Sequence, residues 1–327
     1  MTERRRDPLT GQWRMFASHR QDRTFLPPED QCPLCPTRDP AWPTEVPVDH
    51  YEVAVFDNRF PALTVAPPAP DVASSDLYPV APSVGANEVV LYSDDHHVTS
   101  SQLGPARMRQ VVAVWADRYA ALGRRDEVDY VFIFENRGEA IGVTLHHPHG
   151  QIYAYPEIPP VPAAELAAAT AHLAATGRCV LCDVVARERA DGVRVVAQNL
   201  AFVAFVPFAA RFPYEVHVAA RRHATSLLDL TEPERGLLAE LLLVVTGGYD
   251  RLFGFPLPWV MSVHQAPTDD AGWLPVSHLH LEYTPLHRTA TKLKYLAGSE
   301  LGAGAFINDA APEATAAALR QAVAAGG

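Results

Sequence analysis

Basic residues are scarce in this sequence. Lysine and arginine together number 27, against 38 aspartates and glutamates, so the formal net charge is -11 at pH 7. A protein that binds nucleic acid through its phosphates needs the opposite sign, because lysine and arginine contacts supply much of that affinity. We therefore expect no nucleic-acid partner, although a local basic cluster can still bind one small phosphate ester.

Long apolar runs are also missing. The most apolar stretch, Leu237 to Val245, contains Glu240 and is far shorter than the roughly 20 residues that cross a membrane. The basic segment at residues 1–10 is not followed by the apolar stretch that marks a secretory signal. These features predict a cytoplasmic protein that does not associate with membranes.

Cysteine is rare, with four residues in a chain of 327. So few cysteines exclude a disulfide scaffold as the main source of stability. They occur as two C-x2-C pairs, Cys32/Cys35 and Cys179/Cys182. In a reducing compartment this spacing favours metal binding.

The order of motifs in the first half recurs in the second. C-P-L-C, N-R-F-P, S-D-D-H-H and H-P-H follow one another over residues 32–149. C-V-L-C, A-R-F-P, A-R-R-H and H-L-H follow in the same order over residues 179–280. Four features in one order are hard to obtain by chance, so we predict an internal duplication. We expect an N-terminal domain at 1–165 and a C-terminal domain at 166–327.

Residue patterns predict strands and a long helix in each half, which is an α+β fold class. Alternating or β-branched runs predict six strands, at 51–56, 88–92, 130–134, 193–197, 202–206 and 215–218. Apolar spacing, a capping box or alanine-rich composition predicts four helices, at 105–122, from Thr231 to about Val245, in the second part of 156–175, and at 312–325.

The segment H-P-H-G-Q, His147 to Gln151, is the strongest local signal for chemistry. Side chains two apart on a strand face the same way, so His147 and His149 are expected on one side. A neutral imidazole is a competent nucleophile toward phosphorus, and Gln151 can donate to a phosphoryl oxygen. Gly150 allows a close backbone approach to a ligand. The alternative is a pair of surface or metal-binding histidines.

Cysteines and histidines of the first half form a set typical of structural zinc. Its members are Cys32, Cys35, His147 and one of the neighbours His96 and His97. The motifs alone do not separate these neighbours. Aligning the helices that follow in the two halves without a gap pairs His96 with His223. Aligning the Thr-Ser pair that follows in both halves pairs His97 with His223 instead.

The second half contains two donor sets that compete for His278. One repeats the first half and consists of Cys179, Cys182, His223 and His278. The other consists of Glu165, His264, His278 and His280. One imidazole does not easily serve both sets, so we expect one second metal and leave its ligands open.

The motifs resemble those of the galactose-1-phosphate uridylyltransferase family, a branch of the histidine-triad superfamily. The resemblance covers nearly the whole chain. It rests on D-P-L-T-G-Q-W (7–13), H-R-Q-D-R (19–23), F-D-N-R-F-P-A-L (56–63), F-E-N-R-G (134–138), H-H-P-H-G-Q (146–151), P-Y-E-V-H (213–217) and K-Y-L-A-G-S-E (294–300). It implies tandem histidine-triad half-barrels of mainly antiparallel sheet with flanking helices, assembled as a homodimer with active sites at the subunit interface.

The resemblance also implies a ping-pong reaction. His149 would attack the α-phosphorus of UDP-glucose, Gln151 would steady the phosphoryl oxygens, and galactose 1-phosphate would discharge the uridylyl-histidine. Further matched positions are Asn58, Asn136 and Gly142 for the uridine diphosphate and Arg20, Arg23, Lys294 and Glu300 for the sugar phosphate, contributed across the dimer. The first metal site matches Cys32, Cys35, His96 and His147, with zinc, and the second matches Glu165, His264, His278 and His280, with zinc or iron.

The chain departs from the family pattern at three places. Val143-Thr144 replaces a frequent Cys-Ser, so the phosphate contact is expected from the Thr144 hydroxyl. The second C-x2-C pair and the segment 302–309 also differ from the better-known bacterial form. Two alternatives follow: an adenylyl transferase or phosphorylase of the same fold acting on ADP-glucose or dinucleoside polyphosphates, and a nucleotide-binding module without turnover.

Overall fold

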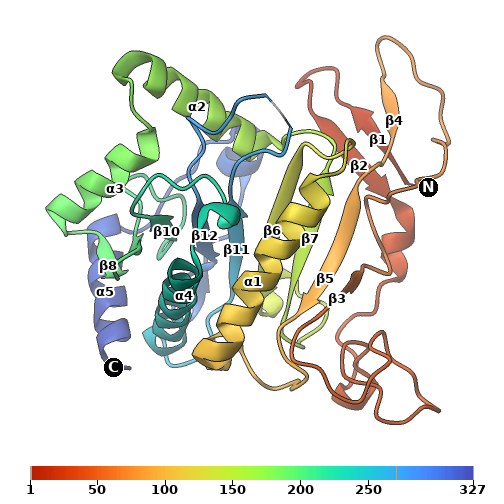
Figure 1. Ribbon diagram of the computed structural model, residues 1–327, viewed down its shortest axis with the longest axis horizontal. Coiled ribbons are helices and arrows are strands. Elements are labelled where there is room, and N and C mark those ends of the chain that lie inside the picture. The colour runs from red at the N-terminus through yellow and green to blue at the C-terminus, as the bar shows by residue number, and fades with distance from the viewer. Residues whose placement is uncertain (1, 270, 327) are drawn as a thin grey trace.

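A single antiparallel sheet of nine strands forms the centre of the computed structural model, which describes residues 2–269 and 271–326 (Figure 1). The strands in spatial order are β3 (Ala54–Asp57), β5 (Ala86–Leu91), β7 (His149–Tyr155), β6 (Tyr130–Arg137), β11 (Trp259–His264), β12 (His280–Pro285), β10 (Val216–Ala220), β9 (Phe202–Phe205) and β8 (Val195–Gln198). Four strands come from the first half of the chain and five from the second.

The two halves meet at the pairing of β6 with β11, where Phe134 lies opposite Ser262. The strand order β3-β5-β7-β6 on one side corresponds to β9-β10-β12-β11 on the other, with β8 added at the edge. The predicted α+β class and internal duplication are therefore confirmed. The halves share one sheet, and the expected boundary at residue 165 lies inside helix α2 (Pro160–Thr176).

Two long helices cover one face of this sheet, which is turned toward the viewer in Figure 1. They are α1 (Gly104–Gly123) and α4 (Glu232–Leu252), and α5 (Pro312–Ala324) packs beside α4. The predicted capping box is present, because Thr231 accepts from the Glu234 amide while Glu234 accepts from the Thr231 amide. Helix α4 continues past the predicted end at Val245 because its apolar face continues to the fully buried Tyr249.

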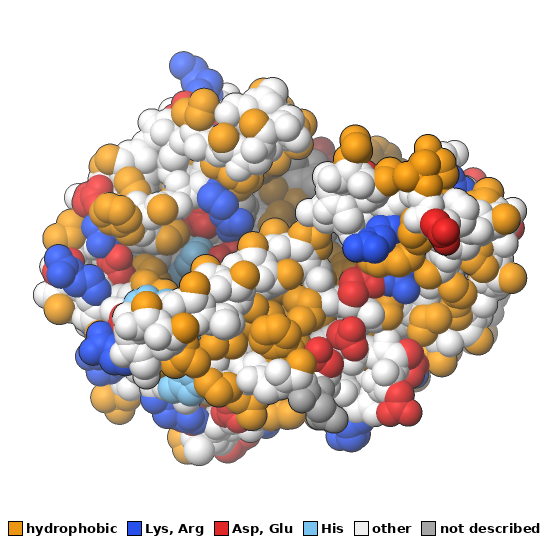
Figure 2. Space-filling model, turned by 90° about the horizontal axis from the view of Figure 1, so that it is seen from above, with side chains coloured by type: hydrophobic (Ala, Val, Ile, Leu, Met, Phe, Trp, Pro, Cys, Tyr) orange, Lys and Arg blue, Asp and Glu red, His pale blue; other side chains and the backbone are white. Residues whose placement is uncertain are grey.

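On the opposite face of the sheet, other segments of the chain pack mainly near its two ends. Near β9 and β10 it packs against α3 (Val180–Asp191), and α2 lies beyond. Near β5 it packs against the loops that carry Cys32 and Cys35. Between these ends the molecule is hollowed, as Figure 2 shows between the part that carries α2 and the N-terminal part. His149 of β7 is half-buried on this face, whereas His264 of β11 is buried and its Nδ1 lies 2.8 Å from the Glu165 carboxylate of α2.

Several elements were not predicted. A small sheet of order β2-β1-β4 consists of β1 (Thr2–Arg6), β2 (Trp13–Ala17) and β4 (Val80–Pro82), and a short hairpin consists of β13 (His287–Thr289) and β14 (Lys292–Leu293). Helix α3 was missed as well. One-turn segments occupy Ser18–Asp22 (η1), Glu29–Gln31 (η2), Ser100–Gln102 (η3), Glu139–Ile141 (η4), Leu227–Asp229 (η5) and Gly298–Gly302 (η6). Within the described residues, none of the helices has the length and apolar composition needed to cross a membrane.

Candidate active site

His149 is the first residue of β7 and faces the hollow side of the sheet. Its Nδ1 lies 2.7 Å from the carbonyl oxygen of His147. A carbonyl can only accept, so Nδ1 carries the proton and Nε2 keeps a free lone pair. Burial lowers the pKa of His149, although the bond to His147 opposes the shift, so the ring is neutral at pH 7. This is the protonation state that a nitrogen nucleophile needs.

His147 does not share the orientation of His149, which corrects the prediction that both point to one side. It precedes β7, and its Nε2 donates to the Ser93 carbonyl at 2.7 Å while its Nδ1 lies 3.6 Å from Cys35 Sγ. The alternation rule fails here because the chain is not yet extended at His147. One histidine therefore faces the cysteines and the other the hollow.

Gly150 is required by packing on the helix side of the sheet. A β-carbon at this position would lie 2.1 Å from the hydroxyl oxygen of Tyr92, a fully buried side chain. The structure thus gives a packing reason for this glycine, and the close backbone approach to a ligand stays a prediction. Any larger residue here would displace the strand that carries His149.

Two cavities meet at His149. The smaller, of about 110 Å³, is lined by Arg23, Phe56, Asn58, Phe60, Thr144 and Gln151 among others. The larger, of about 500 Å³, is lined by Asn136, Arg137, Gly138 and His146 among others. Four of the residues expected near a nucleotide, Asn58, Asn136, Thr144 and Gln151, thus lie around His149. Gly142 lines neither cavity; it ends the η4 turn in the left-handed conformation, with φ 85°.

Both arginines of H-R-Q-D-R lie beside the active site of their own chain. Arg23 lines the smaller cavity. Arg20 donates to the Phe60 carbonyl at 3.0 Å and to the Tyr153 hydroxyl at 3.3 Å. Their approach to Gln151 therefore needs no second subunit, unlike the arrangement that the resemblance implies.

Lys294 and Glu300 lie elsewhere. The Lys294 ammonium is 3.0 Å from a Glu300 carboxylate oxygen and also donates to the Ile307 carbonyl. Neither residue lines a cavity at His149. The structure therefore does not bring these two residues to His149 of their own chain.

The first Cys2His2 set is assembled as its spacing suggests. Cys32, Cys35, His96 and His147 place one donor atom each within 4.8 Å of the others. His96 Nδ1 lies 3.5 Å from Cys35 Sγ. His97 points to solvent, with its Nε2 2.8 Å from a Glu29 carboxylate oxygen. The geometry places His96, and not His97, with the cysteines.

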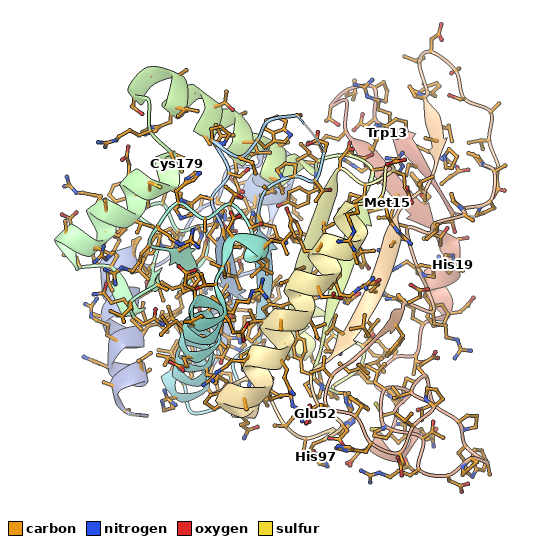
Figure 3. All side chains as sticks on the ribbon, viewed as in Figure 1. Trp13, Met15, His19, Glu52, His97 and Cys179 are labelled. Atoms are coloured by element: carbon orange, nitrogen blue, oxygen red, sulfur yellow. The ribbon has the colours of Figure 1, made fainter. Side chains whose placement is uncertain are left out.

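The second half separates the two donor sets that the sequence left in competition. Cys179, Cys182, His223 and His278 form one group, whereas Glu165, His264 and His280 form another without His278. His278 Nδ1 lies 3.6 Å from Cys179 Sγ and 3.5 Å from Cys182 Sγ. Figure 3 labels Cys179 at the upper left of the molecule and His97, the chain neighbour of His96, at its lower edge, so the two cysteine-containing groups are far apart.

His280 occupies the position that corresponds to His149 in the duplication, and its surroundings differ. Its Nδ1 also donates to the carbonyl two residues earlier, that of His278, at 2.9 Å. Glu282 stands where the first half has Gln151, with a carboxylate oxygen 3.9 Å from His280 Nε2. Burial acts to raise the pKa of Glu282, but His217, His264 and Arg211 together hold it well below its usual range. A fixed carboxylate at this place repels a phosphoryl group.

A cluster around Glu282 was missed in the sequence. Arg211 pairs with Glu215 at 3.2 Å and with Glu282 at 2.6 Å, and His217 lies 3.1 Å from both carboxylates. The motif P-Y-E-V-H contains two of these residues, but nothing in its spacing indicates where Arg211 and Glu282 lie. Tyr153, which touches both Arg20 and Gln151, was also missed.

The duplicated sheet with a histidine at the start of corresponding strands defines a protein of the histidine-triad fold class. Models of the N-terminal and C-terminal domains of galactose-1-phosphate uridyl transferase match residues 1–159 and 165–325. The chain is 36% identical to galactose-1-phosphate uridylyltransferase of Thermotoga maritima, over 98% of both chains. It is 38% identical to the protein of that name from Streptomyces lividans, over 98% of this chain and 87% of that one. A solved structure described as a uridylyltransferase superposes with a TM-score of 0.88 at 35% identity and 99% coverage of both chains.

The chain therefore belongs to the galactose-1-phosphate uridylyltransferase family. An ADP-glucose phosphorylase from Arabidopsis thaliana shares the fold, with a TM-score of 0.72 at 23% identity over 97% of this chain and 98% of that one.

Proposed function

We propose that this protein exchanges a uridylyl group between UDP-glucose and galactose 1-phosphate through a uridylyl-His149 intermediate. The observation that carries the proposal is the free Nε2 of a neutral His149 between two cavities. Membership in the family supports the donor and acceptor, because the relatives above 30% identity carry that activity in their names.

In the first step, His149 Nε2 donates its lone pair to the α-phosphorus of UDP-glucose. A P–N bond forms, the P–O bond to the β-phosphate breaks, and glucose 1-phosphate leaves with the electron pair. In the second step, a phosphate oxygen of galactose 1-phosphate attacks the same phosphorus and the P–N bond breaks, which gives UDP-galactose and restores His149. Two displacements of similar barrier replace one encounter between two anions.

The residues around His149 suit these steps. Gln151 and Arg23 share its smaller cavity and supply N–H donors for the phosphoryl oxygens. Asn58 belongs to the same cavity, and its Oδ1 already accepts from the Phe60 amide at 2.9 Å, so its amide nitrogen is left to a ligand. Asn136 borders the larger cavity, where the second phosphate and hexose would extend.

The product mixture tests this function. With UDP-glucose and galactose 1-phosphate, we expect UDP-galactose and glucose 1-phosphate to appear together, as followed by phosphorus NMR. ADP-glucose with inorganic phosphate serves as the comparison, because the fold also occurs in an ADP-glucose phosphorylase. Faster turnover of ADP-glucose than of UDP-glucose would contradict the uridylyl assignment and favour an adenylyl transferase.

We propose zinc at both Cys2His2 groups. In each group, the first histidine of the H-x-H segment donates its Nε2 proton to a backbone carbonyl. His147 donates to Ser93 and His278 donates to Ala220, so Nδ1 of each ring is left for a metal. Two thiolates and two imidazoles are the usual ligands of a closed structural zinc. Zinc in the first group would brace the segment that precedes His149. Glu165, His264 and His280 then remain an ion-pair network with Glu282 rather than a third metal site.

The metal content of two variants tests whether the second zinc lies at the Cys179 group or at the Glu165 group. We expect about two zinc ions per chain in the wild type and about one in Cys182→Ser, because one ligand of a four-ligand site is lost. His264→Ala, which removes a buried histidine from the other group, should keep both. The reverse pattern, with zinc lost only from His264→Ala, would show that the second metal lies at the Glu165 group.

We also propose a cytoplasmic homodimer. The thiolate ligands need a reducing compartment, and cell fractionation that found the protein elsewhere would contradict this placement. The arm that holds Lys294 and Glu300 exposes Tyr295, Leu301 and Ile307, which suits contact with a second copy. A monomer in analytical ultracentrifugation would exclude a contribution of this arm to another subunit's site.

A further inference from the structure

Tyr153 lies behind the residue that is expected to hold the phosphoryl group. It is on β7, two residues after Gln151 and four after His149, so the three side chains share one face of the sheet. Tyr153 is buried, and its ring packs edge-on against Phe134 with a centroid distance of 5.0 Å. Its hydroxyl oxygen is 3.4 Å from Gln151 Oε1 and 3.3 Å from Arg20 Nη1.

The direction of these hydrogen bonds follows from their chemistry. A guanidinium only donates, so Arg20 uses an acceptor lone pair of the Tyr153 hydroxyl. The hydroxyl proton is then free to point to Gln151, whose amide oxygen accepts it. Arg20 is itself held in place, because the same nitrogen donates to the Phe60 carbonyl at 3.0 Å. The order of donation therefore runs from Arg20 to Tyr153 to Gln151.

This order decides which end of the Gln151 amide meets the substrate. A glutamine amide has an oxygen that accepts and a nitrogen that donates, and the two ends can exchange by rotation. With Oε1 bound to Tyr153, Nε2 is turned toward the cavity that Gln151 shares with His149. The reversed amide would set its oxygen against the phosphoryl oxygens and repel them.

We propose that Tyr153, oriented by Arg20, is a positioning residue that keeps the amide nitrogen of Gln151 directed at the phosphoryl group on His149. This inference rests on the proposed function and deepens it. Preorganised donors contribute most to rate when they need no reorientation as charge develops on the phosphoryl oxygens. The role requires the hydroxyl and not only the ring of Tyr153.

Tyr153→Phe removes the hydroxyl and retains the ring that packs against Phe134. We expect the rate of uridylyl-His149 formation from saturating UDP-glucose to fall about tenfold, as for the loss of one oriented hydrogen bond, with the half-saturating concentration nearly unchanged. Tyr155→Phe is the matched control, since Tyr155 is the next residue on the same face, and it should keep the wild-type rate. A Tyr153→Phe variant as fast as wild type would overturn the proposal.

A double-mutant cycle separates positioning from general support of the fold. If Tyr153 acts through Gln151, then Tyr153→Phe should have almost no further effect in a Gln151→Ala protein. Additive effects of the two substitutions would show that Tyr153 acts independently and would contradict the proposal. A wild-type protein that forms no uridylyl adduct would instead remove the proposed function, and this role with it, so the two failures are distinguishable.

Discussion

Replacing His149 with alanine is expected to abolish uridylyl transfer while the protein stays folded. In the proposed mechanism the substitution removes the atom that forms the covalent intermediate, so the remaining groups could bind substrate but not accept the phosphoryl group. We expect the exchange rate to fall by roughly 10³-fold or more, because the covalent route is lost altogether. His149 is half-buried at the end of a strand, so its loss leaves the core intact. The measurement is the rate of UDP-galactose formation, together with the circular dichroism spectrum.

His50→Ala is the control for this variant. His50 is an exposed histidine that pairs with Asp94 and lines neither cavity at His149. We expect wild-type activity from it. A folded His149→Ala protein that kept substantial activity would exclude a covalent histidine intermediate at this position, whatever the family relationship.

Replacing Cys32 with serine is expected to act on stability more than on substrate affinity. Cys32 is 3% exposed and belongs to the donor group that includes His147, two residues before His149. Loss of one thiolate weakens the site, and the binding free energy of a structural metal is also folding free energy. We expect one zinc fewer per chain and a melting temperature lower by about 10 °C, which corresponds to a few kcal/mol in a chain of this size. The half-saturating concentration of UDP-glucose should change little.

Ala62→Ser provides the comparison for Cys32→Ser. Ala62 is also buried, with 7% exposure, and the substitution places the same hydroxyl in the interior without removing a ligand. It should keep the full zinc content and lose less stability. Unchanged zinc content in Cys32→Ser would contradict the assignment of the first metal group.

The helices and most of the central strands could be predicted because their signals are local. The apolar spacing that predicts 105–122 is the buried face of α1, and Thr231 with Glu234 forms the capping box of α4. Helix α3 was missed because its apolar spacing is weak: its buried residues are Val185 and the charged Glu188. The small sheet of β1, β2 and β4 depends on pairing between residues some 80 positions apart, as Glu3 with Pro82, which no local pattern reveals.

The metal-ligand groups could be predicted where their residues are close together in the sequence, because the spacing then limits where the side chains can lie. The cysteine pairs and the two H-x-H segments gave both Cys2His2 groups, but the choice of His96 depends on how a turn folds. The separation of His278 from Glu165, His264 and His280 also needed the structure, because all four belong to plausible ligand sets in sequence. The contact of Arg20 with Tyr153 joins residues 133 positions apart, and it depends on where η1 lies relative to β7 in the fold.

Intact mass spectrometry of the protein after mixing with a nucleotide sugar shows whether His149 forms a covalent uridylyl intermediate. The reaction contains UDP-glucose or ADP-glucose without acceptor and is quenched at neutral pH, because a P–N bond is labile to acid. We expect a uridylyl adduct with UDP-glucose only, its absence in His149→Ala, and its removal by galactose 1-phosphate. An adenylyl adduct in its place would contradict the assigned nucleotide, and no adduct with either donor would contradict the covalent mechanism.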